Sequence, residues 1–178
     1  MRLHLSAALA AMLLAACATT PTASSGPGQL DPQGPVSVAW SDPAGFSEIT
    51  YGNDRIETLR GTWIRDLAGY LRDRAADRLG TGERLEVELL DVDRAGDYEP
   101  WRGPNASDIR ITRDIYPPRI HLRFRHLDPQ GQVLAEGERR LTDPGFLSRT
   151  AGSYRNTDPL RFEKRLLDDW LERELGRR

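Results

Sequence analysis

The stretch "RIHLRFRHLDPQGQVLAEGERRL", residues 119–141, decides the fold that the sequence predicts. From Ile120 to Phe124 apolar and polar residues alternate, and this period of two is typical of a β-strand with one buried face. The "DPQG" segment at 128–131 has the composition of a tight turn, and it leads to a second strand that carries Leu141. The stretch therefore predicts a β-hairpin.

Two further strands and a helix precede this hairpin. Residues 36–40 alternate in the same way, and so do residues 85–89, which have one apolar and one acidic face. Between them Asn53 can cap a helix and Gly80 can end it. The apolar stripe of this helix comprises Ile56, Leu59, Trp63, Leu67, Tyr70, Leu71, Ala75 and Leu79. Strand, helix and strand in this order predict a crossover unit with two parallel strands.

Glycine and proline modify this pattern in two places. Gly61 and Gly69 lie inside the predicted helix, where each costs about 1 kcal/mol relative to alanine. We therefore expect another element to pack closely on that side, either a strand or the wall of a ligand groove. Ile109 and Ile111 mark a short strand, and the prolines at 117–118 separate it from the hairpin because proline cannot donate to a sheet.

The last element is a helix near the C-terminus. Asp158 can cap it, and Pro159 suits its first position. Its apolar face comprises Phe162, Leu166, Leu167, Trp170, Leu171 and Leu175. The order of elements predicts one α+β domain over residues 36–178, with a four- or five-stranded mixed or antiparallel sheet and two helices packed on one face.

The only cysteine, Cys17, follows a segment typical of export. Arg2 precedes an apolar run over residues 3–16 that is too short to span a bilayer, so residues 1–16 read as a signal peptide. The segment "LAAC" at 14–17 resembles a bacterial lipobox, in which the cysteine is acylated after cleavage. We expect lipid on Cys17; the alternative is an ordinary signal peptide with an incidental cysteine.

The residues after Cys17 predict where the domain lies. Residues 17–35 are rich in Pro, Gly, Ser and Thr and are expected to form a lipidated N-terminus with a flexible tether. Position 18, next to the cysteine, is alanine and not aspartate, which implies sorting to the outer membrane of a Gram-negative cell. The domain is then expected to face the periplasm and to meet the membrane through its lipid.

Composition argues against several classes of function. The chain has 27 acidic and 25 basic residues, interleaved, with a formal net charge of -2, so we expect no nucleic-acid partner. An acylated Cys17 leaves no thiol for a disulfide or a nucleophile. We also expect no cofactor, because the chain has neither a Walker-type nor a dinucleotide-binding glycine loop. No catalytic residue is assigned.

Four stretches together resemble a known family. They are "DVDRAG" (91–96), "IRITRDIYPPRIHLRF" (109–124), "LTDPGFL" (141–147) and "LRFEKRLLDDW" (160–170). In order and spacing they resemble a bacterial exported family, domain of unknown function 3016, over roughly residues 35–175. The resemblance implies an exported or lipid-anchored protein, and it assigns no catalytic residues.

The closest approach to a metal motif lies after the second predicted strand. Four acidic residues around Gly96 occupy ligand positions of a calcium loop, namely Asp91, Asp93, Asp97 and Glu99. Ala95 and Arg102 stand where two further oxygen ligands belong, so we expect no metal site. The alternative for Asp91 and Asp93 is to cap a strand end or to pair with arginines.

One group of polar residues is the candidate binding site. It comprises Asp91, Asp93, Arg110, Arg113, Asp114, Tyr116, Arg119 and Arg123. Arginines spaced two apart on a strand, continued by Arg125, can hold carboxylates or phosphates of an envelope protein or polysaccharide. The alternative is a solvated sheet face on which these arginines pair with Glu136 and Glu138 across the hairpin.

Two functions follow from these features. The first is a non-enzymatic lipoprotein that serves as an accessory or binding module for an envelope component. The second is an envelope hydrolase that uses carboxylates near residues 91–114. A deep pocket with two acids of raised pKa favours the hydrolase, whereas a flat sheet face favours the binding module.

Overall fold

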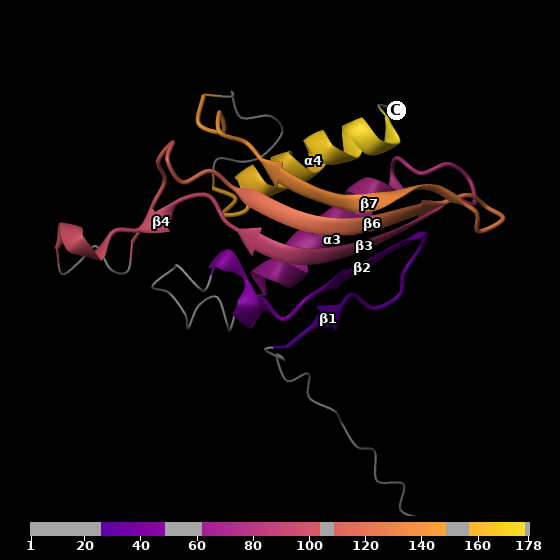
Figure 1. Cartoon of the computed structure of the whole chain (residues 1–178), viewed down its shortest axis with the longest axis horizontal. Coiled ribbons are helices and arrows are strands. Elements are labelled where there is room, and N and C mark those ends of the chain that lie inside the picture. Colours follow the sequence, from indigo (N-terminus) through magenta and orange to yellow (C-terminus); the bar gives the residue numbers. More distant parts are fainter. Residues whose placement is uncertain (1–25, 49–61, 104–108, 149–156, 177–178) are drawn as a thin grey trace, which may run out of the picture.

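The computed structural model describes residues 26–48, 62–103, 109–148 and 157–176. Within these ranges the main sheet has five strands in the order β1-β2-β3-β6-β7, and β4 and β5 form a separate small sheet (Figure 1). The strands are β1 (Gly28–Gln29), β2 (Val36–Trp40), β3 (Arg84–Asp93), β4 (Asp97–Tyr98), β5 (Arg110–Ile111), β6 (Arg119–Leu127) and β7 (Val133–Thr142). The helices are α3 (Trp63–Ala76) and α4 (Arg161–Leu175), and η1 (Pro43–Gly45) and η2 (Pro100–Arg102) are short 3-10 turns.

The sheet is mixed because β2 and β3 run parallel, while its other neighbouring strands are antiparallel. Val36 lies beside Leu85, and Trp40 lies beside Leu89. The chain passes through α3 between these strands, so the predicted crossover unit is confirmed. The predicted hairpin is β6–β7, and the amide of Gly131 donates to the carbonyl of Asp128 in its turn (3.0 Å).

Both α3 and α4 pack on the same face of the sheet, and the core lies between them (Figure 1). The apolar residues that were predicted from periodicity supply this core, including Leu67 and Leu71 of α3 and Leu167 and Trp170 of α4. Trp170 meets the ring of Phe124 edge to face, with 5.6 Å between centroids. This arrangement confirms the predicted α+β domain. None of the helices in the described ranges is long and apolar enough to cross a membrane.

The sheet begins before Val36. Gly28 and Gln29, which lie in the segment predicted as a tether, pair with β2, and Leu30 packs against the core. A Cβ atom at position 28 would lie 2.6 Å from the indole of Trp40, so only glycine allows this close approach. The Gly- and Pro-rich composition of the segment concealed this strand. The predicted signal peptide (1–16) and Cys17 lie outside the described residues.

The helices differ from prediction at their ends. Asn53, Ile56, Leu59 and Gly61 lie outside the described residues, and α3 ends at Ala76, before Gly80. Among the described residues beyond its own helix backbone, nothing lies within 4 Å of a Cβ built at Gly69, so the close packing expected at this glycine was wrong. The helix α4 begins at Arg161, because Asp158 accepts from the amide of Leu160 (2.8 Å) and forms a turn ahead of the helix.

A β-bulge in β3 sets the direction of its last side chains. Pairing with β6 shifts register between Leu89 and Asp91, and Leu90 is the additional residue. Leu89 and Val92 are therefore both buried, and Asp91 and Asp93 lie on the outer face of the sheet. Without the bulge, strict alternation would turn both aspartates toward the core.

Candidate functional site

A polar pocket of about 170 Å³ lies at one end of the main sheet, where β3 ends and β6 begins. Its lining residues are Ser47, Glu48, Asp93, Arg94, Gly96, Asp97, Arg110, Tyr116, Pro117 and Arg119. Three of these residues are arginines and three are acidic, so the formal charges of the lining balance. Segments far apart in the sequence, after η1, after β3 and before β6, meet in its walls.

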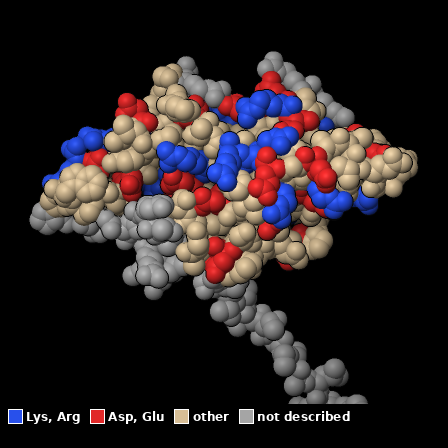
Figure 2. Space-filling view, in the orientation of Figure 1, with Lys and Arg blue, Asp and Glu red and all other residues tan. Residues whose placement is uncertain are grey.

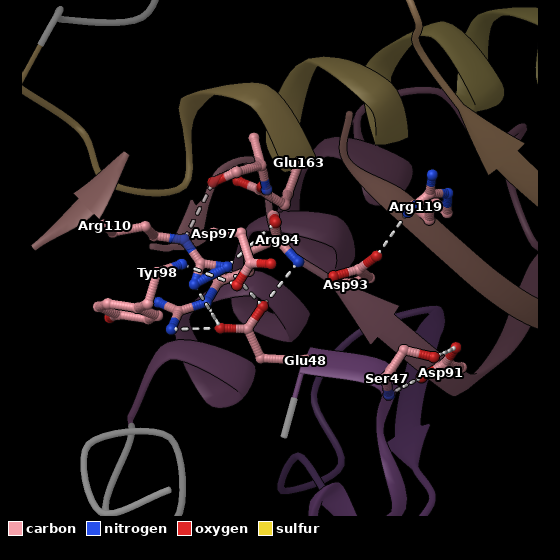
Figure 3. A network of polar contacts seen from close by, with 11 residues as sticks. Ser47, Glu48, Asp91, Asp93, Arg94, Asp97, Tyr98, Arg110, Arg119 and Glu163 are labelled. Carbon is pink, nitrogen blue, oxygen red and sulfur yellow. Dashed lines mark hydrogen bonds and ion pairs between the residues drawn. The ribbon is translucent and has the colours of Figure 1, made fainter. Parts of the chain in front are cut away.

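Glu48 stands at the centre of the hydrogen-bond network beside this pocket (Figure 3). Glu48 is 4% exposed, and its carboxylate accepts hydrogen bonds from two arginines. Arg94 donates from its backbone N (2.8 Å), Nε (3.0 Å) and Nη2 (2.8 Å). Arg110 donates from Nη1 (2.9 Å) and Nη2 (2.8 Å). A buried charge is stable only when it is paired, and here five bonds hold one carboxylate.

Both guanidinium groups are also fixed from other sides. Arg94 lies over the ring of Trp63, 5.0 Å from its centroid, and Arg110 lies over Tyr98 at 5.4 Å. Arg110 donates in addition to the carbonyls of Ala95 (3.0 Å) and Arg94 (3.1 Å). Arg110, a predicted binding residue, therefore holds the chain after β3 against Glu48.

A second buried acid, Glu163, supports the same segment from α4. Its Oε1 accepts from the amide of Ala95 (2.7 Å), while its Oε2 has no hydrogen-bond partner within the described part of the chain. Burial raises the pKa of Glu163, against the opposing effect of the bond from Ala95. The helix α4 thus holds the 94–97 segment through the hydrogen bond that Ala95 donates to Glu163.

Asp91 and Asp93 hold the other side of the pocket. Asp91 accepts from the backbone N and the Oγ of Ser47, both at 2.7 Å. Asp93 accepts from Nη1 of Arg119 at 2.8 Å, directly across the sheet. Burial raises the pKa of Asp93, although the bond from Arg119 opposes this shift. These contacts agree with the interpretation that the two aspartates cap the strand end and pair with arginine.

Gly96 allows the chain to turn between Arg94 and β4. Its φ is +85°, a region that residues with side chains rarely adopt. A Cβ at this position would also lie 2.9 Å from the carbonyl oxygen of Ile111. The amide of Gly96 donates to the carbonyl of Tyr116 (3.0 Å), so the turn brings that residue to the pocket wall.

A third buried acid, Glu99, lies where the chain continues into η2. It forms ion pairs with Arg102 and Arg113, the latter at 3.0 Å, and it accepts from the hydroxyl of Tyr116 (3.1 Å). Desolvation and this bond to Glu99 raise the pKa of the Tyr116 hydroxyl. The acid connects two predicted binding residues, Arg113 and Tyr116, to the β4–β5 segment.

The structure brings together four of the eight predicted binding residues. Asp93, Arg110, Tyr116 and Arg119 line the pocket. Of the other four, Asp91 binds a lining serine, Arg113 binds Glu99, Asp114 is exposed and does not line the pocket, and Arg123 lies on the open sheet face.

Sequence reasoning missed Glu48 and Glu163, and it considered Glu99 only as a position of the calcium-like motif, not as a buried acid. Glu163 lies three and four residues before Leu166 and Leu167, so its place on the apolar face of α4 was a usable signal. Glu48 and Glu99 carry no comparable signal, because their partners are distant or irregular in spacing. Only the folded chain shows that their charges are buried.

The outer face of the main sheet carries rows of opposite charge (Figure 2). Arg123 pairs with Glu138 (3.2 Å) on β7 and with Glu88 (3.3 Å) on β3. Arg125 pairs in the same way with Glu136 (3.5 Å) and Glu86 (3.2 Å). For Arg123 and Arg125 the alternative interpretation therefore holds, in which arginines of a solvated sheet face pair with Glu138 and Glu136 across the hairpin.

The four acids of the calcium-like motif do not converge. Asp91 binds Ser47, Asp93 binds Arg119, Asp97 accepts from the amide of Tyr98 (2.7 Å), and Glu99 lies among arginines. Within the described ranges no group of three His, Cys, Asp or Glu residues is arranged to hold a metal ion.

Comparison with known proteins shows which family the chain belongs to. Residues 34–173 match the family described as "Protein of unknown function (DUF3016)". The chain belongs to this family. Comparisons with curated proteins and with solved structures found no match. The match spans the described domain from just before β2 almost to the end of α4, so the pocket and the open sheet face both belong to the DUF3016 region.

Proposed function

We propose that this protein is a lipoprotein of the outer membrane, anchored through Cys17, whose periplasmic domain binds an envelope component without catalysing a reaction. One observation above all others supports a role without catalysis. The carboxylates around the pocket are occupied by arginines, hydroxyl groups or backbone amides of the same chain, as Glu48 shows with its five hydrogen bonds.

This occupancy argues against a hydrolase that uses carboxylates near residues 91–114. Such an enzyme needs two acids whose environments separate their pKa values and which both reach the substrate. Asp93 lines the pocket and has a raised pKa, but the other two acids of the described lining are bound by the chain itself. Glu48 is held by Arg94 and Arg110, and Asp97 accepts from the amide of Tyr98. The lining therefore gives little support to a pair of acids that acts on a substrate.

Arg119 is the residue best placed to bind a partner. It lines the pocket and also stands in the row of arginines on the open sheet face, with 56% of its side chain exposed. A guanidinium has five N–H donors, and Arg119 uses Nη1 to bind Asp93. Its outward donors suit a carboxylate or phosphate of an envelope protein or polysaccharide.

Crosslinking in intact cells tests this binding role with a matched pair of variants. Arg125 is 50% exposed and, like Arg119, pairs with an acid that lies directly opposite it on β3. Unlike Arg119, it does not line the polar pocket. Arg119→Gln should lose the crosslinked partner, and Arg125→Gln should keep it. Equal retention in both variants would contradict a role for the pocket.

Turnover of cell-wall material by the purified protein separates binding from hydrolysis. Asp93→Asn keeps the shape of the side chain and removes its proton chemistry. If wild type shows turnover that Asp93→Asn abolishes while the crosslinked partner remains, the protein is a hydrolase and the binding proposal is wrong.

The anchor is tested separately by labelling cells with an alkyne analogue of palmitate. The wild-type protein should carry the label and fractionate with the outer membrane, and Cys17→Ser should carry no label. Equal label in both proteins, or none in either, would refute the anchor without bearing on the pocket.

A further inference from the structure

The segment around β4 and β5 buries one acid, Glu99, and exposes three large apolar side chains. We call residues 97–103 and 109–116 the arm; Figure 1 shows β4 and η2 beyond the end of the main sheet. Glu99 of the arm is 1% exposed, whereas Trp101, two residues later, is 70% exposed. A buried acid next to an exposed tryptophan is the reverse of the usual pattern in water.

Two further apolar side chains of the arm are exposed. Ile109 and Ile115 are 58% and 62% exposed, at the two ends of the β5 segment. Half of the large apolar residues that are exposed in the described part of the chain thus lie in this short arm; the other three are Val133, Leu134 and Leu147. Such a concentration marks an interaction surface.

The base of the arm is held firmly, so its tip is pre-oriented. Glu99 binds Arg102, Arg113 and Tyr116, and Arg110 lies over the ring of the buried Tyr98. Contact at the tip therefore requires little additional ordering of the described residues, which lowers the entropic cost of binding.

We propose that this arm inserts Trp101 into the interface of a lipid bilayer. Tryptophan is enriched at membrane interfaces because its ring is apolar and its N–H remains hydrated. The side chains of Arg102 and Arg113 in the same arm are 48% and 40% exposed, and their guanidinium groups can lie at the level of the phosphates.

The size of the apolar tip favours a bilayer over a protein. A specific protein interface buries about 800 Å² on each partner. An aromatic side chain buries about 150–250 Å², so three side chains of that size or smaller remain below this area even when fully buried. Insertion into a bilayer requires no such minimum buried area. Exposed Asp114 and the nearby arginines also leave the arm without a strong net charge, so the attachment is apolar and should resist salt.

The proposed anchor makes a weak contact of this kind effective, and this step rests on the proposed function. Nine residues lead from Cys17 to Gly26, where the described structure begins. At about 3.3–3.6 Å per residue, they keep Gly26 within roughly 30 Å of the lipid. A lipid-anchored arm is therefore always close to the bilayer, and its effective concentration is high.

The distribution of tryptophans provides a selective test. Trp40, Trp63 and Trp170 are buried, so a change in fluorescence on adding vesicles reports on Trp101. The sample is the mature chain, residues 17–178, with Cys17→Ser, which retains every described element without lipid. The vesicles contain phosphatidylethanolamine and phosphatidylglycerol, with or without bromine on the acyl chains.

The wild-type emission should shift to shorter wavelength with vesicles, the brominated lipid should quench it, and both effects should persist at high salt. Trp101→Ser should weaken vesicle binding about tenfold, which is the loss of one buried aromatic side chain. The control is Leu134→Ser, which removes a residue of similar exposure from β7, outside the arm, and should leave binding unchanged.

Four results would overturn the proposal. The first is no shift and no quenching with vesicles. The second is a shift that grows with protein concentration in the absence of vesicles, which would make a second copy of the chain the occupant. The third is an equal loss of vesicle binding in Trp101→Ser and Leu134→Ser. The fourth is release from the vesicles by salt. None of them affects the palmitate labelling of Cys17, so failure of the arm and failure of the anchor are distinguishable.

Discussion

Replacement of Glu48 by glutamine tests whether its network holds this end of the domain together. Glu48→Gln keeps the shape of the side chain but removes its charge and turns an amide NH₂ toward guanidinium donors. Arg94 and Arg110 then lose their shared counter-ion. Removing one partner of a buried ion pair costs about 3–5 kcal/mol. A domain of this kind has about 5–15 kcal/mol of stability, so the loss is a large part of the total.

The assays are urea unfolding and thermal unfolding, both followed by circular dichroism. We expect a lower midpoint with an unchanged slope, and a fall in Tm of about 6–20 °C, at roughly 2–4 °C per kcal/mol for a chain of this size. Glu86→Gln is the control, because Glu86 forms an exposed pair with Arg125 (3.2 Å) that contributes under about 1 kcal/mol. The reasoning is refuted if the two variants lose similar stability.

Two other predictions concern glycine and a buried acid. Gly96→Ala should destabilise the domain by about 1–3 kcal/mol, because it places a side chain at positive φ against Ile111. Gly69→Ala, in open space on α3, should stabilise the domain by up to about 1 kcal/mol. Thermal unfolding of both variants measures the sign of each change. The raised pKa of Glu163 gives stability that is complete below the unfolded pKa and is lost as pH rises through the folded pKa. Glu163→Gln should remove this loss, so the unfolding free energy of the variant relative to wild type should rise over that pH window; parallel pH profiles would contradict this.

Local periodicity was enough to predict the main elements of the sheet and the helices. Residues 36–40, 85–89 and 120–124 alternate because one face of each strand meets the core, and that face is visible in the sequence. The family resemblance was also present in the chain itself. Arginines paired across the hairpin were predictable, since a period of two places them opposite acidic residues.

The ends and irregularities of elements were less visible. The strand β1 lies in a Gly- and Pro-rich segment, and Gly28 is required by the indole of Trp40, which arrives from a neighbouring strand. The bulge at Leu90 turns Asp91 and Asp93 outward, although strict alternation predicts the opposite face for both. Such features depend on contacts between strands and leave little trace in local composition.

Residues close together in the chain were enough to predict the α+β class and the apolar faces of the elements, which the structure confirms; the export signal, read in the same way, stays a prediction. The folded chain was needed to show that Glu48 meets Arg94 and Arg110, and that Trp101 is exposed while Glu99 is buried. The burial of a charge depends on which distant segments surround it, and the free energy of that charge depends on the partners that they bring. The chemistry of this site was therefore set by the fold, from side chains that look ordinary in the sequence.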